Sequence, residues 1–434
     1  MSDTYCPIPW IFQAVRNNGD VRVCCQANIT KNQGVIRHED GTSFNAGRDD
    51  MNLARNADMM KAMRLNMLNG VWSDECTRCK NEEDSGLTSR RTYEMEHWGE
   101  VYNKKWASSV TQPDGTIETP VHYLDLRFGN LCNLACRMCG PTDSHTWYKD
   151  YVKLYGNRYK DTHGTVELEK NAKGRWFTND YDWHNSEKFW EYLETNLENI
   201  QHVYMAGGEP LMIERHYDFL NKCIDTGNSK NILLEYNTNV TNIPNRVLDQ
   251  WAEFKQVLIG ASVDGMGDVL EYQRYPAKWT AIENNLQKID QLPKNISAWL
   301  SFTVTSINVF HVPDFMLWKT QQGFKKINSS KKKPLITHHV AHRPYHMNVQ
   351  VLPDELKKQI TDKYHKAVEQ FDSELQKPAG VVLDSISNYM NKASLYEDHW
   401  HDFVSNTVKL DKLRKQNITD IVPQYKEYIN DKNL

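Results

Sequence analysis

Cysteine is the residue type whose number and spacing say most about the chemistry of this chain. The sequence has nine cysteines, and eight of them lie before residue 140. An odd number of thiols in a long chain without an export signal argues against a framework of disulfide bonds. Clustered thiols in a reducing compartment are typically metal ligands, because thiolates at short spacing chelate zinc and the iron of iron–sulfur clusters. The sequence therefore predicts metal sites in its first third.

Three of these cysteines form a Cys-x3-Cys-x2-Cys motif on one short loop, made by Cys132, Cys136 and Cys139. Three thiolates on one loop can hold three irons of a 4Fe–4S cube and leave the fourth iron free to bind a small molecule. A structural zinc site normally takes four protein ligands, so a zinc knuckle would need a distant fourth ligand. The spacing favours the iron–sulfur interpretation, with the zinc knuckle as its alternative.

This loop resembles the signature of the radical S-adenosylmethionine (SAM) enzymes, and further motifs follow in the order typical of that family. Gly207-Gly208-Glu209-Pro210 comes after the next strand-like run and resembles the family's GGEP motif, which lies against the SAM amino group. The resemblance implies further SAM contacts near the ends of later strands, from Asn237, Asn239, Ser262, Asp264 and Arg274. From the residues alone, Asn or Ser at a strand end can instead cap a helix. An arginine such as Arg274 can instead pair with a surface carboxylate.

A second group of cysteines lies near the N-terminus. Gly19 predicts the turn of a hairpin that brings a cysteine at 24 back near the one at 6, and a Cys-x2-Cys pair follows at 76 and 79. The sequence does not decide between Cys24 and its neighbour Cys25. The pattern resembles the auxiliary-cluster region of SPASM and twitch subdomains, placed ahead of the barrel as in the N-terminal twitch radical SAM group. The resemblance implies an auxiliary 4Fe–4S cluster bound by four thiolates, those of Cys6, Cys24, Cys76 and Cys79. Four thiolates would bind a zinc ion equally well.

The hydrophobic pattern predicts the elements that position these cysteines. Short runs rich in β-branched and aromatic residues predict strands at 121–128, 202–206, 232–237, 256–263 and 298–305. A sixth strand is ambiguous between 335–340 and 347–352. Helical patterns alternate with the strands, at 213–223, 245–254, 279–289 and 313–322. This order predicts an α/β fold with a parallel sheet or barrel, and the resemblance implies a partial (β/α)6 TIM-like barrel with its site at the C-terminal rim of the strands.

We expect three consecutive segments. Residues 1–118 would form the cysteine-rich, twitch-like auxiliary cluster region, 119–352 the radical SAM partial barrel with an insertion at about 156–200, and 353–434 a helical C-terminal extension. Inside the insertion, Phe189, Trp190, Leu193 and Leu197 share one helical stripe that predicts packing into a core. The first 120 residues show no sustained hydrophobic period, which predicts loops and short elements held by metal.

Composition excludes several classes of protein. The chain has 434 residues, 39% hydrophobic and 25% charged, with a formal net charge of −4. It has no apolar run long enough for a membrane span and no signal-peptide pattern, so we expect a soluble cytoplasmic protein without a membrane partner. The negative charge argues against a main task of holding nucleic acid. The lysines at 325–326 and 331–333 predict a solvated loop and leave nucleic acid open as a partner.

The resemblance implies an enzyme that reductively cleaves SAM to methionine and a 5′-deoxyadenosyl radical, which then abstracts hydrogen from a substrate. A donor such as a flavodoxin or ferredoxin would supply the electron to the first cluster. Auxiliary-cluster relatives often modify peptides, so a peptide or protein is the leading substrate class, and a nucleotide, sugar or small metabolite is the alternative. A non-catalytic zinc or iron–sulfur interaction module is the hypothesis of another class.

Overall fold

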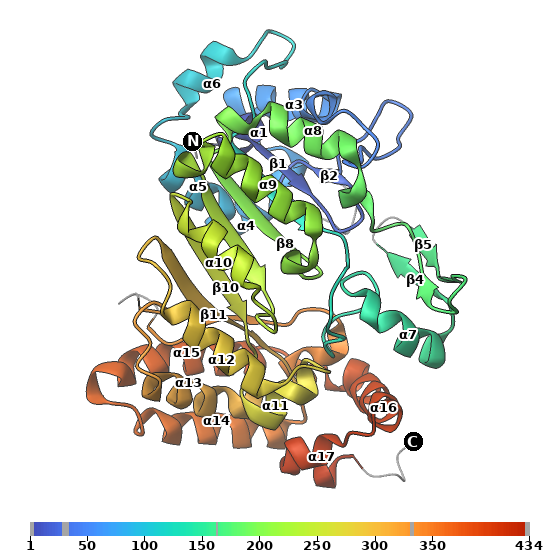
Figure 1. The fold of residues 1–434 in the computed structure, drawn as a ribbon. Coiled ribbons are helices and arrows are strands. Elements are labelled where there is room, and N and C mark those ends of the chain that lie inside the picture. Colours follow the sequence, from blue (N-terminus) through green and yellow to red (C-terminus); the bar gives the residue numbers. More distant parts are fainter. Residues whose placement is uncertain (1–3, 28–33, 162–163, 330–333, 430–434) are drawn as a thin grey trace. The chain divides into compact units, whose positions relative to one another are not determined.

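The computed structural model of the chain describes residues 4–27, 34–161, 164–329 and 334–429 (Figure 1). The chain forms two compact units, each assembled from several stretches. The first comprises Met1–Leu131, Arg158–Tyr236 and Asp249–Val257, and the second comprises Cys132–Asn157, Asn237–Leu248 and Leu258–Leu434. The units interleave along the chain, whereas the three segments expected from the motifs are consecutive. Those segment boundaries divide the chain by motif and stay predictions.

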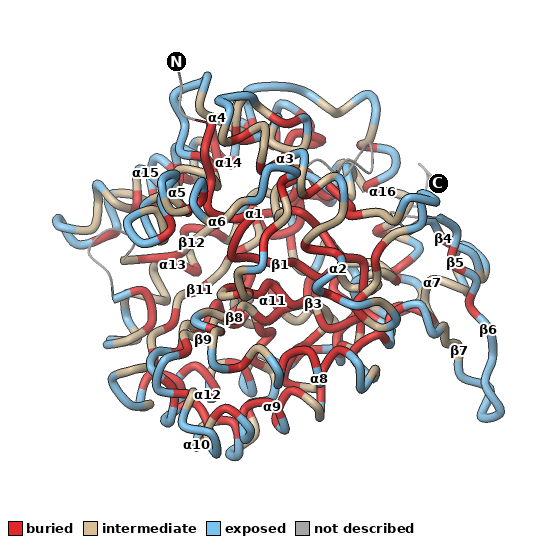
Figure 2. The backbone as a smooth tube through the Cα atoms, turned by 90° about the horizontal axis from the view of Figure 1, so that it is seen from above, coloured by how far each residue is buried: buried red, intermediate tan, exposed pale blue. Residues whose placement is uncertain are grey.

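The first unit is built on a sheet with the strand order β9-β8-β3-β1-β2. Its parallel ladder joins β1 (Phe12–Val15) to β3 (Tyr123–Phe128), β3 to β8 (His202–Gly207), and β8 to β9 (Leu233–Thr238). The short β2 (Val21–Arg22) returns antiparallel to β1. Gly19 makes the turn between them with a φ of +86°, so the predicted N-terminal hairpin is confirmed. Figure 2 shows that buried residues follow β1 and β3.

Among the described residues, eight α-helices of the first unit precede, follow or lie between these strands in the sequence. They are α1 (Ile8–Ile11), α2 (Met51–Arg55), α3 (Asp58–Leu68), α4 (Thr77–Asp84), α5 (Arg90–Trp98), α6 (Lys104–Val110), α8 (Glu187–Thr195) and α9 (Glu214–Asp225). The insertion adds two antiparallel hairpins, β4 (Arg158–Asp161) with β5 (Gly164–Glu167), and β6 (Glu169–Lys170) with β7 (Trp176–Phe177).

The expectation that the first 120 residues hold only loops and short elements is wrong, because α3 and α5 are regular helices. The buried side of α3 includes an arginine, which a hydrophobic pattern does not count. The Arg64 side chain is fully buried, and its guanidinium donates to the carbonyl oxygens of Pro9 at 2.9 Å and Gly115 at 3.0 Å. Helix α5 starts from a capping box at Ser89 rather than from an apolar stripe.

The predicted core stripe of the insertion is confirmed on α8 and on the 3₁₀ helix η4 (Leu197–Asn199) that follows it. Phe189, Trp190, Leu193 and Leu197 are each at most 3% exposed. The Phe189 ring lies 4.8 Å from the ring of Trp183, edge on, and 5.5 Å from that of Trp190. These contacts join α8 to the segment before it by aromatic packing.

Replacing Phe189 with alanine is expected to lower the free energy of unfolding by about 3–5 kcal/mol, because the fully buried ring leaves a cavity among aromatic neighbours. Urea denaturation of the metal-free protein measures this loss. The matched control is Glu191→Ala on the exposed side of the same helix, which should stay within about 0.5 kcal/mol of the wild type. Equal stability of both variants would contradict the core assignment.

The second unit contains strands in the order β12-β11-β10. They are β10 (Gln256–Ser262), β11 (Ile296–Val304) and β12 (Thr337–Val340), and β12 pairs in parallel with β11. The sixth strand is therefore the one expected at 335–340. The competing segment at 347–352 contains a 3₁₀ helix, η9 (Val349–Val351), where Asn348 accepts a hydrogen bond from the Gln350 amide.

In the described part of the second unit, helices outnumber strands. The α-helices are α7 (Tyr148–Tyr155), α10 (Asn245–Ala252), α11 (Gly267–Gln273), α12 (Trp279–Asp290), α13 (Val312–Gln321), α14 (Asp354–Val368), α15 (Ser373–Asn391), α16 (Tyr396–Arg414) and α17 (Ile418–Ile421). Residues of β9, α10 and β10 are divided between the two units. The alternation of parallel strands with helices confirms the predicted α/β class, and α14 to α17 confirm the predicted helical C-terminal region.

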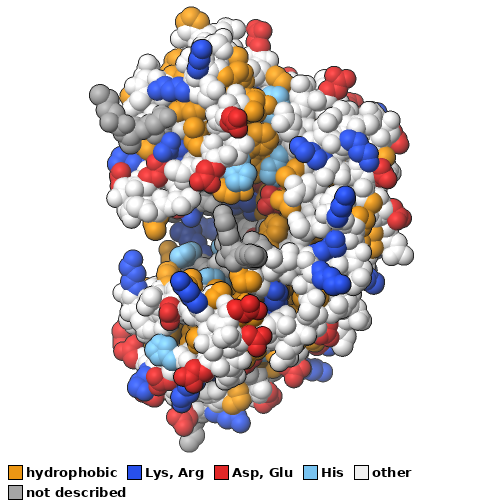
Figure 3. Space-filling model, turned by 90° about the vertical axis from the view of Figure 1, so that its left-hand side faces the viewer, with side chains coloured by type: hydrophobic (Ala, Val, Ile, Leu, Met, Phe, Trp, Pro, Cys, Tyr) orange, Lys and Arg blue, Asp and Glu red, His pale blue; other side chains and the backbone are white. Residues whose placement is uncertain are grey.

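Two surface properties bear on partners. Among the described residues, no helix combines the length and the apolar character needed to cross a bilayer. On the face drawn in Figure 3, lysine and arginine side chains are interspersed with aspartate and glutamate. Of the lysines that left nucleic acid open, Lys326 donates to the Pro293 carbonyl at 3.2 Å, and 331–333 lie outside the described residues.

Candidate functional site

The three cysteines of the Cys-x3-Cys-x2-Cys motif lie together on the loop that begins the second unit. Cys132 and Cys136 are buried and Cys139 is half-buried. The thiols of Cys136 and Cys139 are hydrogen-bonded to each other, which lowers the pKa of Cys136 and raises that of Cys139. Because burial raises both thiol pKa values, the deprotonated loop needs compensating positive charge. The Arg274 guanidinium supplies some of it, since its charge lowers the pKa of both thiols.

This loop is held along two sides. On one side, the amides of Ala135 and Arg137 donate to the carbonyl oxygens of Tyr275 at 2.7 Å and Gln273 at 2.8 Å. On the other side, the Trp147 indole donates to the Cys136 carbonyl at 2.9 Å. Irregular backbone is costly to bury unless its polar groups are paired. These bonds fix the loop backbone between its cysteines.

The Gly207–Pro210 segment forms a backbone ladder with the end of the β3 loop, all within the first unit. The amides of Gly208 and Glu209 donate to the carbonyls of Gly129 at 3.0 Å and Leu131 at 2.7 Å. A Cβ on Gly208 would lie 2.4 Å from the Leu131 oxygen, so only glycine permits this approach. Pro210 opens a 3₁₀ helix, η5 (Pro210–Met212), and the Glu209 carboxylate accepts from the Leu211 amide at 3.2 Å. Since Leu131 precedes Cys132, the motif supports the strand end from which the cysteine loop starts.

Of the two asparagines expected at the SAM rim, Asn239 lies against the cysteine loop. Its side-chain nitrogen is 3.8 Å from the Cys132 sulfur and donates to the Asn133 side chain at 2.9 Å. Its oxygen accepts from the Thr241 amide at 3.0 Å. Asn237 instead lies over Gly260, where a Cβ would come within 2.3 Å of its side-chain oxygen.

Asp264 and Arg274 form a buried ion pair in the second unit. The Arg274 Nε donates to an Asp264 carboxylate oxygen at 2.6 Å, and the Thr303 amide donates to the other at 2.7 Å. Burial lowers the pKa of Arg274, but the charges of Asp264 and Cys136 raise it more, so the guanidinium is firmly protonated. The Nη atoms of Arg274 make no hydrogen bond to the described residues. Ser262 ends β10, half-buried.

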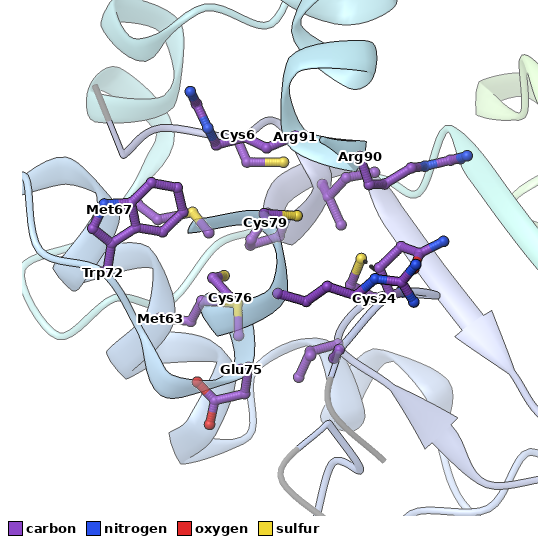
Figure 4. Close-up of a pocket in the computed structure, with 16 residues that line it drawn as sticks. Cys6, Cys24, Met63, Met67, Trp72, Glu75, Cys76, Cys79, Arg90 and Arg91 are labelled. Atoms are coloured by element: carbon purple, nitrogen blue, oxygen red, sulfur yellow. Dashed lines mark hydrogen bonds between the residues drawn. The ribbon is translucent and has the colours of Figure 1, made fainter. Parts of the chain in front are cut away.

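The four N-terminal cysteines line one cavity of the first unit (Figure 4). They come from separate stretches: Cys6 precedes α1, Cys24 follows β2, and Cys76 and Cys79 stand at the start of α4. The rest of the lining includes Met63, Met67 and Trp72. The four cysteines that the sequence groups together thus line one cavity, and their role as metal ligands stays a prediction.

The electrostatics around these four thiols combine burial with amide donors. Burial raises the pKa of Cys76 to about 12 and also raises that of Cys79, where the backbone N–H groups of Arg90 and Arg91 at the start of α5 oppose the rise. The Gln26 amide donates to the Cys24 sulfur at 3.4 Å. Amide hydrogen bonds to sulfur and restricted solvent are the environment in which proteins hold iron–sulfur clusters, so the donor set fits such a group.

The structure separates Cys24 from Cys25. Cys24 lines the cavity with the other three cysteines, whereas Cys25 is not part of its lining. The hydrogen bond from Cys24 lowers the pKa of Cys25, and the charges of Arg90 and Arg127 lower it further. Each thiolate of a 4Fe–4S cluster binds its own iron, so cluster ligands need not converge on one point. Within the described parts of the chain, no three His, Cys, Asp or Glu side chains converge as ligands of a single metal ion.

One set of polar residues was missed from the sequence. In the first unit's sheet, the face opposite the buried Leu124 and Leu126 carries charged and aromatic side chains from three neighbouring strands: Tyr123, Asp125, Arg127, His202, Tyr204 and Glu235. Asp125 is 4% exposed and pairs with Arg127 at 3.3 Å. The signal was present in the sequence, because Tyr123–Phe128 alternates polar and apolar residues, whereas a strand buried on both faces reads as continuously apolar.

Comparisons with known proteins bear on the segment that carries these motifs. Residues 126–322 match the model of the Radical SAM superfamily. Among solved structures, native anSMEcpe with bound AdoMet and Cp18Cys peptide aligns with 16% identity and a TM-score of 0.35, over 58% of this chain and 61% of that chain. Streptococcus suis SuiB aligns with 11% identity and a TM-score of 0.33, over 77% of this chain and 66% of that chain. TYW1 with a lysine-pyruvate adduct bound aligns with 13% identity and a TM-score of 0.24, over 58% and 70%.

The chain thus spans about three fifths of the length of the anSMEcpe structure. A search of curated proteins found no match. The matched superfamily segment runs from the end of β3 to the end of α13, and it contains the cysteine loop, the Gly207–Pro210 ladder and the Asp264–Arg274 pair. Residues 126–322 of this chain are therefore similar to a radical SAM domain.

Proposed function

We propose that the protein is a radical SAM enzyme whose first cluster is held by Cys132, Cys136 and Cys139. The observation that carries the proposal is the loop of three buried or half-buried thiols, fixed by backbone bonds on two sides, within the matched segment. A 4Fe–4S cluster with SAM supplies, when bound, the electron that cleaves SAM to methionine and a 5′-deoxyadenosyl radical for hydrogen abstraction.

The chain's own contribution is to bind and orient SAM. The Arg274 Nη atoms are directed by the Asp264 pair and would receive the SAM carboxylate. The Gly207–Pro210 backbone would lie against the SAM amino group, with Asn237, Asn239 and Ser262 as further contacts. Asn239 has a second task, because it already contacts the Cys132 sulfur and Asn133. Its side chain would orient the cysteine loop.

We assign Cys6, Cys24, Cys76 and Cys79 to an auxiliary 4Fe–4S cluster in a twitch-like region at residues 1–118. The support is that three separate segments bring these four thiols to one cavity with amide donors around them. A cluster with four protein ligands has no open iron, so it would relay electrons or stabilise the unit. Zinc bound at the same four cysteines is the alternative, and metal analysis of the protein distinguishes it from an iron–sulfur cluster.

The substrate class in this proposal is a peptide or protein, with a flavodoxin or ferredoxin as electron donor. The charged face that contains Asp125 and Arg127 suits a polar substrate, because it offers both an acceptor and donors. A nucleotide, sugar or small metabolite is the competing class. Mass spectrometry of material that copurifies with the protein separates the two.

The test is formation of 5′-deoxyadenosine, measured by mass spectrometry. Protein reconstituted with iron and sulfide is given SAM and a strong reductant, beside a variant with Cys132, Cys136 and Cys139 replaced by alanine. We expect the nucleoside from the wild type alone, because the variant lacks all three thiolates. An iron-loaded wild type that neither forms the nucleoside nor binds SAM would contradict the proposal and favour a non-catalytic metal-binding module.

A further inference from the structure

Of the two residues between the last two cysteines of the motif, the first is a buried arginine. The Arg137 side chain is 0% exposed, and its guanidinium carbon lies 3.7 Å from the ring centre of Tyr272. Its Nε donates to the Tyr272 carbonyl at 3.2 Å, and its Nη2 donates to the side chains of Asp411 at 2.5 Å and Gln416 at 3.0 Å. A buried guanidinium is tolerated only when its charge is compensated. Here Asp411 provides that compensation.

Asp411 is itself held in place at both oxygens. The oxygen that receives Arg137 also accepts from the Tyr272 hydroxyl at 2.8 Å. The other oxygen accepts from the Ile418 amide, at the start of α17, at 2.8 Å. This carboxylate is therefore already oriented for Arg137, and its acceptor sites are occupied by groups of the same unit.

A second buried arginine, Arg414 at the end of α16, contacts both segments that bond the loop. The Arg414 Nε donates to Asp150 of α7 at 2.9 Å, and its guanidinium stacks on the rings of Trp147 and Tyr275 at 4.8 Å and 4.6 Å. These two aromatic residues belong to the segments that bond the cysteine loop. Leu410 packs with Ala135 and Trp147. Figure 1 shows α7, α16 and α17 near one another in the second unit.

We propose that Asp411 is a positioning residue for the cluster loop, so that the C-terminal helix α16 takes part in holding Cys136 and Cys139 in their ligating positions. The residue acts through Arg137, which it joins across 274 positions of sequence. The inference rests on the proposed function only in taking the group bound by the loop to be an iron–sulfur cluster. The contact between Asp411 and Arg137 is present in the chain without any bound group. A chain without α16 would keep all three cysteines and lose the partner of the arginine between them.

The first test needs no cluster. In the metal-free protein, iodoacetamide labelling of Cys136 is followed by mass spectrometry of its peptide. Asp411→Asn keeps the shape of the side chain and removes the charge, so Cys136 should react at least about tenfold faster than in the wild type, the range expected for loss of a charged hydrogen bond. Cys223, which is fully buried on α9 of the first unit, reports global unfolding in the same sample and should be unchanged.

Matched variants separate positioning from general stability. Asp402→Asn makes the same chemical change at an exposed position of α16 and should label like the wild type. The double variant Arg137→Gln with Asp411→Asn removes the uncompensated charge, so its Cys136 labelling should fall back towards the wild-type rate. Wild-type labelling of Asp411→Asn, equal acceleration at Cys223, or no rescue in the double variant would each overturn the proposal.

A second readout uses the reconstituted protein. Iron release to a chelator should be about 10- to 100-fold faster in Asp411→Asn than in Asp402→Asn, the range seen when residues that orient metal ligands are changed. If the wild type takes up no cluster on the motif while the labelling pattern holds, the proposed function fails and the positioning role stands. If the wild type holds its cluster and Asp411→Asn releases iron no faster than Asp402→Asn, the positioning role fails and the proposed function stands.

Discussion

Replacing Cys24 with alanine is expected to remove about half of the iron that the reconstituted wild type binds, about four of about eight atoms per chain. Replacing its neighbour Cys25 is expected to leave all of it. The two adjacent thiols differ in their surroundings. Cys24 lines the cavity shared with the other three N-terminal cysteines. Cys25 does not line it, and the charges of Arg90 and Arg127 lower the pKa of Cys25. Iron and sulfide analysis after anaerobic reconstitution measures the difference.

Cys223→Ala is the control for a buried cysteine outside both groups, and it should retain full iron. Half-loading in Cys25→Ala together with full loading in Cys24→Ala would reverse the ligand assignment. One zinc per chain in the wild type, lost in Cys24→Ala, would show that the N-terminal site is the zinc alternative. Four iron atoms in every N-terminal variant and in the wild type would show that these cysteines hold no cluster.

Asp264→Asn is expected to lower the free energy of unfolding of the metal-free protein by about 3–5 kcal/mol, the cost of leaving one member of a buried ion pair without its partner. Asp264 is 0% exposed and Arg274 is 7% exposed, so solvent cannot compensate the guanidinium. Denaturant unfolding followed by circular dichroism measures the loss.

Asp384→Asn, at an exposed position of α15, makes the same chemical change and should stay within about 0.5 kcal/mol of the wild type. Measuring SAM affinity on the same samples distinguishes two roles for Asp264. A large loss of stability supports the ion pair as the element that fixes Arg274. Unchanged stability with weakened SAM binding would instead make Asp264 a direct ligand contact and contradict its role in fixing Arg274.

The sequence predicted most of the β and α elements from residue 121 onward, because their periods are regular. It also grouped the four N-terminal cysteines that line one cavity, whereas the metal-ligand role of these cysteines and of the three motif cysteines stays a prediction. It could not choose between Cys24 and Cys25, since adjacent residues differ only in the direction of their side chains. The sixth strand was ambiguous because both candidate segments carry similar apolar residues.

The contacts that the sequence could not predict are those that join distant residues through charge. The sequence pattern predicts Arg64 as an exposed residue of α3, whereas in the structure its guanidinium is buried and donates to backbone carbonyls. Likewise, nothing in the local pattern connects Arg137 with Asp411. Arg274 was expected to reach SAM or a surface carboxylate, and its partner is a buried carboxylate ten residues earlier. Hydrophobic periodicity records which faces are apolar, and it carries no information on which buried charges compensate one another.

The parallel pairing of β1 with β3 also orders events during synthesis. Phe12 of β1 pairs with Tyr123 of β3, so β1 leaves the ribosome long before the strand with which it pairs. Contacts of such sequence separation form late, after the entropy of the intervening loop has been lost. Cys6 and Cys24 flank β1 and its hairpin, so the nascent chain carries exposed thiols until β3 has been made. A metal group at the N-terminal cavity, as proposed, would therefore bind only after β3 has been translated.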